Sequence, residues 1–508
     1  MVDSIALENF KAIKSRLTLD LRPLTILCGS NSCGKSSILQ SILLLKQTTE
    51  GQGPGQVLAA NGRLAHLGSL ENIVYDHDAT RDVRLEYVFP LDSLTVAQAR
   101  TGRPRLPYLV RHLVSDEQPQ PDGLQLRISV SLSSRSSGQH RKGLKPTVVE
   151  SFEAAVQNRG STMDSDDLHP RVTLTRDELT KNYSVEWHNI PEPYSGSDSG
   201  TSKTLSGGAR DRVKFSHLFP ASFSRLEGTS RNTPLGVAFM RVSRWLTFAR
   251  EIERFSTGSI NYLGPLREEP ARRYIYEDEA VEVGVKGENA AYLYMLEGNK
   301  RIGTYLLHDE QSGQEIKRPN MKFGQAVDSW LSLMGIQNLR PKTTENGIIS
   351  LMMSAQAGDV TPVNMADVGF GVSQVFPIVV AGLRTAVGSC LLLEQPEIHL
   401  HPRLQMQMAD FLLSLAQTGR QVLVETHSDH LVNRLVRRIV EDPTGDLAKL
   451  VAIYFIEPSE EGSKVQEVRL DPERGIVNWP KGFFDQASNE QTKIIEAGLQ
   501  KRVHGPKV

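Results

Sequence analysis

Residues Gly29-Ser-Asn-Ser-Cys-Gly-Lys-Ser36 match the phosphate-loop pattern GxxxxGK(S/T) at every position. An apolar run, 24–28, precedes the loop, and apolar residues at helical spacing follow it from about Lys35 to Gln47. In a strand, glycine loop and helix of this kind, the backbone wraps a phosphate and the free N–H groups of the helix N-terminus face the anion. The sequence therefore predicts a nucleotide site in which Lys35 reaches the outer phosphates and Ser36 offers its hydroxyl to Mg²⁺.

Two later strands end in groups suited to the same site. The run Cys390-Leu-Leu-Leu-Glu394 is an apolar strand that delivers an acid at its C-terminal end, where α/β sheets place their ligands. We expect Glu394 to hold the Mg²⁺ shell together with Ser36. A second buried strand, 421–425, delivers His427, and we expect this histidine to sense the γ-phosphate.

The composition is that of an ordinary globular protein. The chain has 508 residues, 58 Lys plus Arg against 59 Asp plus Glu, 39% hydrophobic residues and 3 Cys, which excludes collagenous, disordered and polybasic classes. Three cysteines cannot form a disulfide framework, and they indicate a reducing compartment. The N-terminus lacks the apolar core of a signal peptide, and no apolar run approaches the ~18 to 20 residues that span a bilayer. We therefore expect a cytoplasmic protein with no membrane partner.

The remaining pattern predicts an α/β layer arrangement with parallel strands in its core. Short strands are expected within the first 90 residues and near 124–132 and 171–174. The stretch 195–208 is rich in Ser and Gly, and we interpret it as a flexible surface loop. Helices are expected from about Val237, over 322–334, over 402–417 and over 429–440.

Five segments together resemble a known family. They are Asn9-Phe10-Lys11, GSNSCGKSS, Gly369-Phe-Gly-Val-Ser-Gln374, LLLEQPEIHLHP and ETHSDH. Their combination is similar to the ABC-type ATPases of the OLD, RecF and SMC group, and it resembles stand-alone ATPase subunits of bacterial antiviral defence systems. The resemblance covers roughly residues 1–90 and 360–440. It implies an ABC-type P-loop ATPase head with a central parallel sheet and an antiparallel β lobe. The long separation between Ser36 and Glu394 predicts a large mixed α+β insertion, and the lack of sustained apolar heptads predicts no long coiled coil.

The resemblance also assigns site residues. In that group two heads sandwich ATP and Mg²⁺, so the signature segment of one head meets the γ-phosphate held by the other. The ATP-binding residues that it implies are Asn31, Ser32, Cys33, Gly34, Lys35, Ser36 and Ser37 in the loop, and Gly369, Gly371, Ser373 and Gln374 in the signature. A closer match to the transporter-type signature, LSGG at 205–208, lies far before Glu394, whereas a signature helix should lead almost directly into that strand. We therefore reject it.

One position departs from the family pattern. The residue after Glu394 is normally a glutamate that polarises the attacking water, and here it is Gln395. An amide orients water but cannot accept its proton, so general-base catalysis from this position is lost. Either Glu397 substitutes, or hydrolysis is simply slow, which would suit a nucleotide-gated clamp. The predicted catalytic set is Glu394, Gln395, Glu397 and His427.

Two other groups of residues near the motifs have plainer explanations. A zinc site is suggested by three histidines, but no CxxC or HExxH pattern accompanies His399, His401 and His427. All three cysteines lie beside the nucleotide motifs. These are Cys28, Cys33 and Cys390. We interpret them as small apolar residues in tight spaces rather than as a redox switch.

The spacing of the motifs predicts four regions. We expect the N-terminal half of the head with its β lobe in 1–150, a partly helical insertion in 151–360, the C-terminal half of the head in 361–470 and a tail element in 471–508. Inside the insertion, the segment 262–267 resembles stand-alone bacterial ATPases of the group. Its Arg267 would reach a phosphate or a partner, or would lie in a packed turn.

These features predict an ATPase subunit that forms a head-to-head dimer or higher oligomer and controls a separate effector, such as a nuclease, in a bacterial DNA-linked system. Antiviral defence is the favoured context, on resemblance alone. The alternatives are a low-turnover ATP-gated scaffold that sequesters an effector and a RecF-like DNA-repair ATPase. DNA contact is possible through three basic segments, which contain Arg100, Arg103, Arg105 and Arg111, then Arg135, Arg141, Lys142 and Lys145, then Arg434, Arg437 and Arg438.

Overall fold

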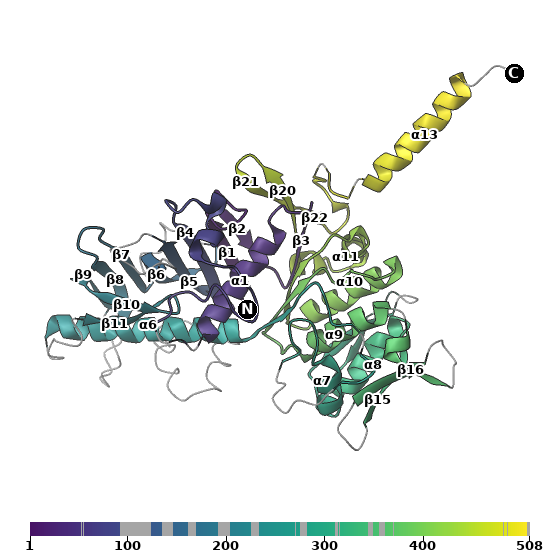
Figure 1. The fold of residues 1–508 in the computed structure, drawn as a ribbon, viewed down its shortest axis with the longest axis horizontal. Helices are drawn as coiled ribbons and strands as arrows, with labels where there is room; N and C mark the ends of the chain where they lie inside the picture. The colour runs from purple at the N-terminus through teal and green to yellow at the C-terminus, as the bar shows by residue number, and fades with distance from the viewer. Residues whose placement is uncertain are drawn as a thin grey trace.

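The computed structural model is shown in Figure 1. It describes residues 1–504 apart from 52, 54, 92–122, 135–145, 161–168, 192–203, 225–232, 270, 275–281, 310–312, 314, 344–348, 355–360, 369, 481 and 485. An antiparallel β lobe lies on the left of this view and an α/β layer on the right. The two ends of the chain meet in the α/β layer, where strand 24–29 pairs with strands 421–425 and 451–459.

The central sheet carries the motif strands in its middle. Its strands, in spatial order within the described residues, are β12 (Ile260–Leu263), β18 (Cys390–Glu394), β19 (Gln421–Glu425), β3 (Leu24–Gly29), β20 (Val451–Ser459) and β21 (Gly462–Val468). Neighbouring strands are parallel except β20 and β21, which pair antiparallel. Because β3 is paired on both sides and covered on both faces, its sequence is a continuous apolar run rather than an alternating one.

Helices cover both faces of this sheet. On one face α1 (Lys35–Glu50) follows the phosphate loop directly, and its Ile38 and Leu39 share a core with Leu27 of β3. The neighbouring Ile26 points into a second core, which is closed by α9 (Phe370–Arg384), α10 (Pro402–Gln417) and α11 (Asp429–Glu441). The predicted helices at 35–47, 402–417 and 429–440 are therefore present, with small shifts at their ends.

The antiparallel lobe has the strand order β2-β1-β4-β5-β6-β7-β8-β9. These strands are β1 (Ser4–Glu8), β2 (Leu17–Asp20), β4 (Val83–Pro90), β5 (Leu124–Ser133), β6 (Val148–Asn158), β7 (Arg171–Arg176), β8 (Tyr183–Pro191) and β9 (Thr204–Asp211). Helix α6 (Pro234–Gly258) packs on this lobe and on α1, and its Trp245 is fully buried. The region also contains α2 (Leu70–Ile73), η1 (Tyr75–His77), β10 (Val213–Ser216) and β11 (Phe219–Phe223).

Two expectations for this region differ from the structure. The predicted boundary at 150 falls inside β6, because one continuous sheet runs on to β9. The predicted loop 195–208 ends in a strand, since Thr204 to Gly208 pair with β8, and 195–203 lies outside the described residues. The rejected LSGG sequence therefore lies in a β-strand, which cannot present a helix N-terminus to a phosphate.

The insertion packs against α9. It contains α7 (Ala290–Glu297), α8 (Phe323–Leu333), β13 (Tyr305–His308), β14 (Glu315–Arg318), β15 (Gln337–Thr343) and β16 (Ile349–Ser354), followed by β17 (Pro362–Asn364) and η2 (Met365–Asp367). Because β17 pairs with β16, the predicted boundary at 360 divides a small sheet. A further strand of the predicted insertion, β12, belongs to the central sheet, so this part of the chain is not a separate appendage.

The C-terminal region follows β21 and packs first on α11. It contains β22 (Leu470–Asp471), β23 (Gly475–Ile476) and α13 (Gln486–His504), and a short helix, α12 (Leu447–Leu450), precedes β20. Helix α13 projects away from the other elements (Figure 1). No helix in the described part of the chain is long and apolar enough to cross a membrane. The predicted fold class is confirmed: a central parallel sheet carries the phosphate loop, an antiparallel lobe and a mixed insertion flank it, and the described residues form no long coiled coil.

Candidate active site

The phosphate loop has the backbone shape of an anion cradle. Ser32 and Gly34 both lie in the left-handed region, at φ 57° and 98°, a geometry that turns successive N–H groups toward one point. The Lys35 ammonium folds back onto the loop, where it donates to the carbonyl oxygens of Gly29 at 3.2 Å and Ser30 at 2.6 Å. The positive charge of Lys35 thus lies inside the phosphate loop, where a phosphate can replace its two carbonyl acceptors.

Not every predicted loop residue offers its side chain. Asn31 and Ser32 are exposed, whereas the side chains of Cys33 and Ser37 are buried. Cys33 and Ser37 can therefore contact a phosphate only through their backbone N–H groups. Gly29 is required for packing, because a Cβ at this position would lie 1.9 Å from the carbonyl oxygen of Ile456 on β20.

Glu394 lies at the C-terminal end of β18, as predicted, with 9% of its surface exposed. The hydroxyl of Tyr262 on β12 donates to its Oε1 at 2.8 Å. Burial raises the pKa of the Glu394 carboxyl, and the hydrogen bond from Tyr262 and the charge of Arg267 partly offset that effect. The predicted acid is therefore in place, but its partner is a tyrosine that the sequence reasoning did not select.

The hydroxyl of Ser36 contacts a different acid. It donates to Oε1 of Glu425 at 3.0 Å. Burial, with the nearby charge of Glu394 as a smaller cause, raises the pKa of Glu425 to about 7. Sequence reasoning missed Glu425, although the rule that selected Glu394 also applies to it, because it is the acid that ends the next buried parallel strand.

Arg267 fixes the backbone that follows Glu394. Its guanidinium donates to the carbonyl oxygens of Glu394 at 2.7 Å and Gln395 at 2.8 Å, and only 5% of the residue is exposed. Gln395 has a φ of 46°, an uncommon conformation for a residue with a side chain. The structure thus gives Arg267 an internal role at the end of β18, which corresponds to the packed-turn alternative.

Glu397 is tied to the loop that follows β19. Its Oε2 accepts a hydrogen bond from the Thr426 hydroxyl at 2.8 Å, and its Oε1 accepts one from the backbone N–H of His427 at 2.6 Å. Burial raises the pKa of this carboxyl, and the hydrogen bonds from the loop oppose the rise. The acid expected to replace a catalytic glutamate therefore has both oxygens engaged in joining two loops.

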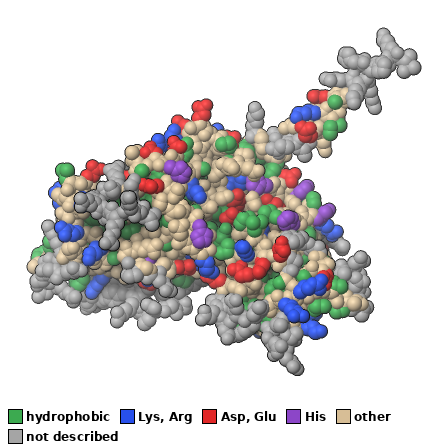
Figure 2. All heavy atoms as spheres, in the orientation of Figure 1, with side chains coloured by type: hydrophobic (Ala, Val, Ile, Leu, Met, Phe, Trp, Pro, Cys, Tyr) green, Lys and Arg blue, Asp and Glu red, His purple; other side chains and the backbone are tan. Residues whose placement is uncertain are grey.

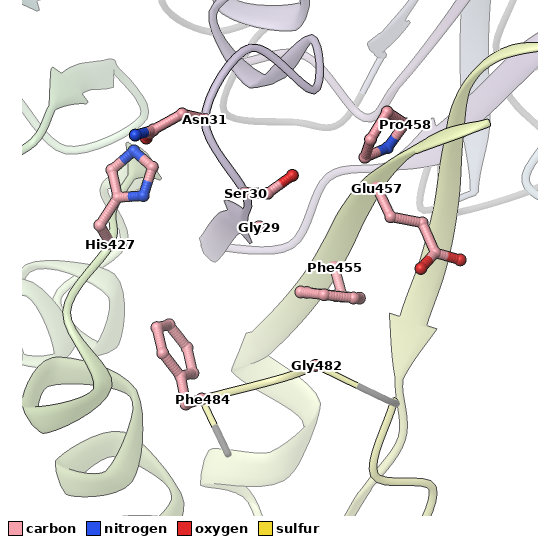
Figure 3. A pocket seen from close by; sticks show the side chains of 9 residues that line it. All are labelled: Gly29, Ser30, Asn31, His427, Phe455, Glu457, Pro458, Gly482 and Phe484. Atoms are coloured by element: carbon pink, nitrogen blue, oxygen red, sulfur yellow. The ribbon is translucent and has the colours of Figure 1, made fainter. Parts of the chain in front are cut away.

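A cavity of about 640 Å³ lies beside the phosphate loop (Figure 3). Asn31 and His427 face one another at one side of it. Burial, with a smaller effect from the positive charge of Lys35, lowers the pKa of His427, so its imidazole is neutral at pH 7. The opposite wall is formed by β20 and by a C-terminal segment, through Phe455, Glu457, Pro458, Gly482 and Phe484.

The predicted signature does not line this cavity. Gly369 lies outside the described residues, and Gly371, Ser373 and Gln374 form the first turns of α9. Ser373 and Gln374 are 4% and 2% exposed, and the described lining of the cavity contains neither of them. Within one chain, the structure therefore brings together the loop, Glu394, Gln395, Glu397 and His427, but not the signature.

The other two predicted histidines do not form a metal site with His427. Nδ1 of His401 accepts a hydrogen bond from the backbone N–H of Arg403 and caps α10. No group of three or more His, Cys, Asp or Glu side chains in the described ranges could hold a metal by itself. The three cysteines are free thiols and are buried, and burial raises the pKa of Cys28 and Cys390. This agrees with a packing role.

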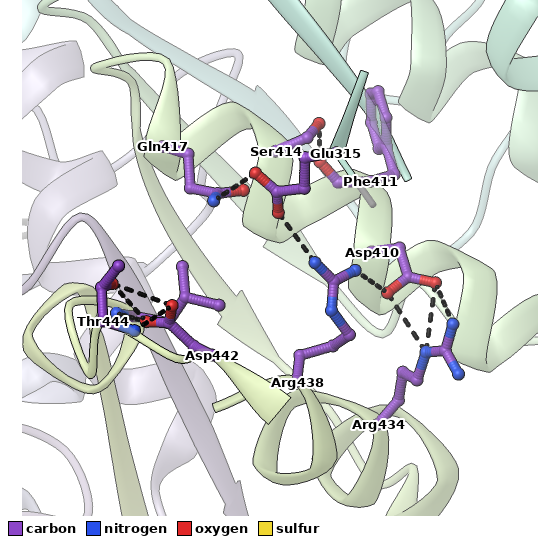
Figure 4. Close-up of polar contacts among 10 residues, drawn as sticks. Glu315, Asp410, Phe411, Ser414, Gln417, Arg434, Arg438, Asp442 and Thr444 are labelled. Atoms are coloured by element: carbon purple, nitrogen blue, oxygen red, sulfur yellow. Dashed lines mark hydrogen bonds and ion pairs between the residues drawn. The ribbon is translucent and has the colours of Figure 1, made fainter. Parts of the chain in front are cut away.

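The basic segments give little support for a DNA surface. The segments around Arg100 and Arg135 lie outside the described residues. In the third segment Arg434 and Arg438 are buried and paired with Asp410 (Figure 4), so only Arg437 faces solvent. On the face shown in Figure 2, the described Lys and Arg side chains are scattered among Asp and Glu side chains. Of the three arginines that α11 was considered able to offer to DNA, two are therefore unavailable.

Comparison with known proteins identifies the family. Residues 1–195 and 306–432 match the family described as the AAA ATPase domain. The chain belongs to that family. It is thus an ATP-binding ATPase. Residues 448–494 match a family described as a protein of unknown function, DUF3696, and this region includes β20 and the segment of Gly482 and Phe484. No curated protein matches the chain.

Solved structures resemble this ATPase only distantly. An SMC head bound to the C-winged helix domain of ScpA has 10% identity and a TM-score of 0.39, covering 93% of this chain and 98% of that chain. The SMC head domain from Thermotoga maritima has 10% identity and a TM-score of 0.32, covering 92% and 98%. An SMC head with an extended coiled coil bound to the C-terminal domain of ScpA, derived from Pyrococcus furiosus, has 10% identity, a TM-score of 0.39 and coverage of 98% of both chains. At these scores, the assignment of the fold rests on the sheet order described above.

Proposed function

We propose that this ATPase hydrolyses ATP slowly, forms a dimer around the nucleotide and controls a separate effector protein. The observation that carries the proposal is that the phosphate loop and His427 line one cavity, while Ser36 at the end of that loop hydrogen-bonds to Glu425, the register neighbour of Glu394 on β18. Lys35 would exchange its two carbonyl acceptors for the outer phosphates of ATP, and the loop N–H groups would bind the inner ones. A neutral His427 would donate a hydrogen bond to the γ-phosphate.

The metal-binding residues fit a small hard cation. A hydroxyl and carboxylate oxygens, the ligands that Mg²⁺ prefers, are supplied here by Ser36 and Glu394. A buried oxygen of Glu425, the acid that Ser36 contacts, has no hydrogen-bond partner among the described residues. When bound, Mg²⁺ would neutralise charge on the β- and γ-phosphates. The chain's own contribution is to hold these oxygens at the ends of α1 and β18 before the nucleotide arrives.

Slow turnover follows from the groups near the attacking water. Gln395 can orient that water but cannot take its proton. Glu397 already accepts hydrogen bonds on both oxygens, so its use as a base would require the loop of Thr426 and His427 to loosen. The same observation favours a second candidate function, an ATP-gated scaffold that turns over very little and sequesters an effector.

Dimer formation would complete the site. Gly371, Ser373 and Gln374 lie at the start of α9 and do not line the cavity of their own chain. In a two-fold dimer each chain would present the first turn of α9 to the nucleotide of the other through Gly371 and backbone N–H groups, because the side chains of Ser373 and Gln374 are buried in their own chain.

The effector is proposed to be a separate protein, such as a nuclease, in a bacterial antiviral system. The antiviral context rests on the sequence resemblance. Exposed apolar side chains support a protein partner, because Ile494, Ile495 and Leu499 on α13 are 68%, 63% and 54% exposed. A RecF-like repair function has weaker support, since Arg434 and Arg438 are unavailable to a duplex.

The proposal is tested by ATP hydrolysis and oligomeric mass, measured together on the purified protein with and without duplex DNA. Wild type is expected to hydrolyse slowly and to double in mass with ATP and Mg²⁺. Lys35→Ala is expected to lose ATP binding, and Lys449→Ala, an exposed lysine paired with Asp446, is the matched control. A stable dimer with negligible turnover would favour the scaffold, and strong stimulation by DNA would favour repair. Full hydrolysis by Lys35→Ala would refute the site.

The water-handling residues need a separate pair of variants. Gln395→Ala is expected to slow hydrolysis further while ATP binding stays near that of wild type. If Gln395→Ala and Glu397→Gln both leave the rate unchanged, then neither residue positions the attacking water, and the explanation for slow turnover fails.

A further inference from the structure

Glu425 ends β19 in a place that no motif assigns. The residue is 4% exposed, and its Oε1 accepts the hydrogen bond from Ser36, the residue that ends the phosphate loop. Its other oxygen, Oε2, is buried and has no hydrogen-bond partner in the described residues. A buried polar atom without a partner costs about 1–3 kcal/mol, and more when it is charged. A site that retains such an atom indicates that something else binds to it.

A second carboxylate, that of Glu394, lies beside Glu425 and faces the same side of the sheet. Glu394 and Glu425 are paired in register on adjacent parallel strands, which lie about 4.8 Å apart, so their side chains leave the sheet on the same side. The backbone reinforces this pairing, since the N–H of Gln395 donates to the carbonyl oxygen of Glu425 at 2.7 Å. Two buried acids this close repel one another unless a proton or a cation lies between them.

The third acid of the cluster does not share this opening. Both oxygens of Glu397 accept hydrogen bonds from the loop after β19. Tyr262 occupies Oε1 of Glu394. The oxygens that remain for a ligand are therefore one on Glu394, Oε2 of Glu425 and the Ser36 hydroxyl, which is an all-oxygen set suited to Mg²⁺ or Mn²⁺.

We propose that Glu425 is a second carboxylate of the divalent-cation site, acting with Ser36 and Glu394 in the ATP-bound protein. The Ser36–Glu425 hydrogen bond then holds the site together until the cation arrives with the nucleotide. Two carboxylates and one hydroxyl are too few ligands for a tight site, so the phosphates of ATP complete the shell. This inference rests on the proposed ATP site and adds a ligand to it.

The test measures metal binding rather than turnover. Mn²⁺ is titrated into the protein with ATP and followed by electron paramagnetic resonance, and a fluorescent ATP analogue is titrated separately in EDTA. For Glu425→Gln, Mn²⁺ affinity is expected to fall by at least about tenfold, while ATP binding in EDTA stays within about twofold of wild type. The glutamine keeps an acceptor for Ser36, so the melting temperature of the nucleotide-free variant should not fall. Glu467→Gln, an exposed acid on β21, is the control and should match wild type.

Three outcomes overturn the inference. The first is equal Mn²⁺ affinity in wild type and Glu425→Gln. The second is a parallel loss of ATP binding in EDTA, which would mean that Glu425 shapes the phosphate loop instead of binding metal. The third is that wild type binds no ATP, which also refutes the proposed function, whereas the first two leave it intact. Should Glu425→Gln fold poorly, Glu425→Asp serves in its place, because the shorter carboxylate keeps the charge and withdraws the oxygen from the cation.

Discussion

The buried ion cluster between α10 and α11 gives the sharpest test of the packing (Figure 4). Asp410 accepts hydrogen bonds from Nε and Nη2 of Arg434 and from Nη1 of Arg438, at 2.9 to 3.1 Å. The three side chains are only 2% to 6% exposed. Replacing Asp410 with asparagine keeps the volume of the side chain and removes its charge, so two buried guanidinium groups lose their common carboxylate.

The expected loss of stability follows from that burial. Removing one member of a buried ion pair costs about 3–5 kcal/mol, because the remaining charge stays desolvated. Arg438 keeps a second partner in Glu315, at 2.7 Å, which limits the effect of the substitution on that arginine. We therefore expect Asp410→Asn to destabilise the α10–α11 layer by about 3 kcal/mol, near the lower end of this range.

The assay is hydrogen exchange of the α10 and α11 amides, together with urea unfolding, because a chain of this size need not unfold in one step. The matched control is Arg437→Ala on α11, the helix that carries Arg434 and Arg438. Arg437 pairs with Glu441, and the two side chains are 57% and 45% exposed. The expected change in the free energy of unfolding is therefore below about 1 kcal/mol. Equal exchange in the two variants would refute the argument that burial makes the Asp410 cluster important.

Three further predictions concern other parts of the chain. Burial raises the pKa of Glu253 to about 8, so the native state binds more protons than the unfolded state above pH 4.5, and stability should fall as pH rises toward 8. Glu253→Gln should flatten this pH dependence of the urea midpoint. Gly29→Ala should lose binding of a fluorescent ATP analogue, because its Cβ would meet the carbonyl of Ile456. A variant that binds normally would contradict this packing. Arg267→Lys should lower kcat about tenfold while KM changes little, because one ammonium cannot hold both carbonyls that fix Gln395. An unchanged kcat would show that the clamp is dispensable.

The sequence predicted well those parts of the site that short stretches of chain determine. The phosphate loop with the helix that follows it, and the strand that ends at Glu394, are local patterns, and each of them is present. His427 lies beside the loop because two parallel strands place their C-terminal ends at one edge of a sheet.

What the sequence could not predict depends on contacts between distant segments. Tyr262 reaches Glu394 only because β12 joins the edge of the central sheet, and its short apolar pattern did not indicate which strand it would pair with. The arginines of α11 were interpreted as a basic surface because helical periodicity does not show that Asp410 lies on the facing helix. The predicted boundaries at 150 and 360 fall inside sheets for the same reason, because strand pairing between distant segments is not visible in the local pattern.

The position of β3 has a consequence for how the protein is made. Ile26 pairs with Val424 on one side and with Ile453 on the other, so both neighbours of this strand are synthesised roughly 400 residues after it. At about 5–20 residues per second, the ribosome takes at least about 20 s to supply them, and until then the phosphate loop follows a strand with two bare edges. A nascent or prematurely ended chain therefore carries the complete nucleotide motif without a nucleotide site. We therefore expect ATP binding to appear only after synthesis has passed β20.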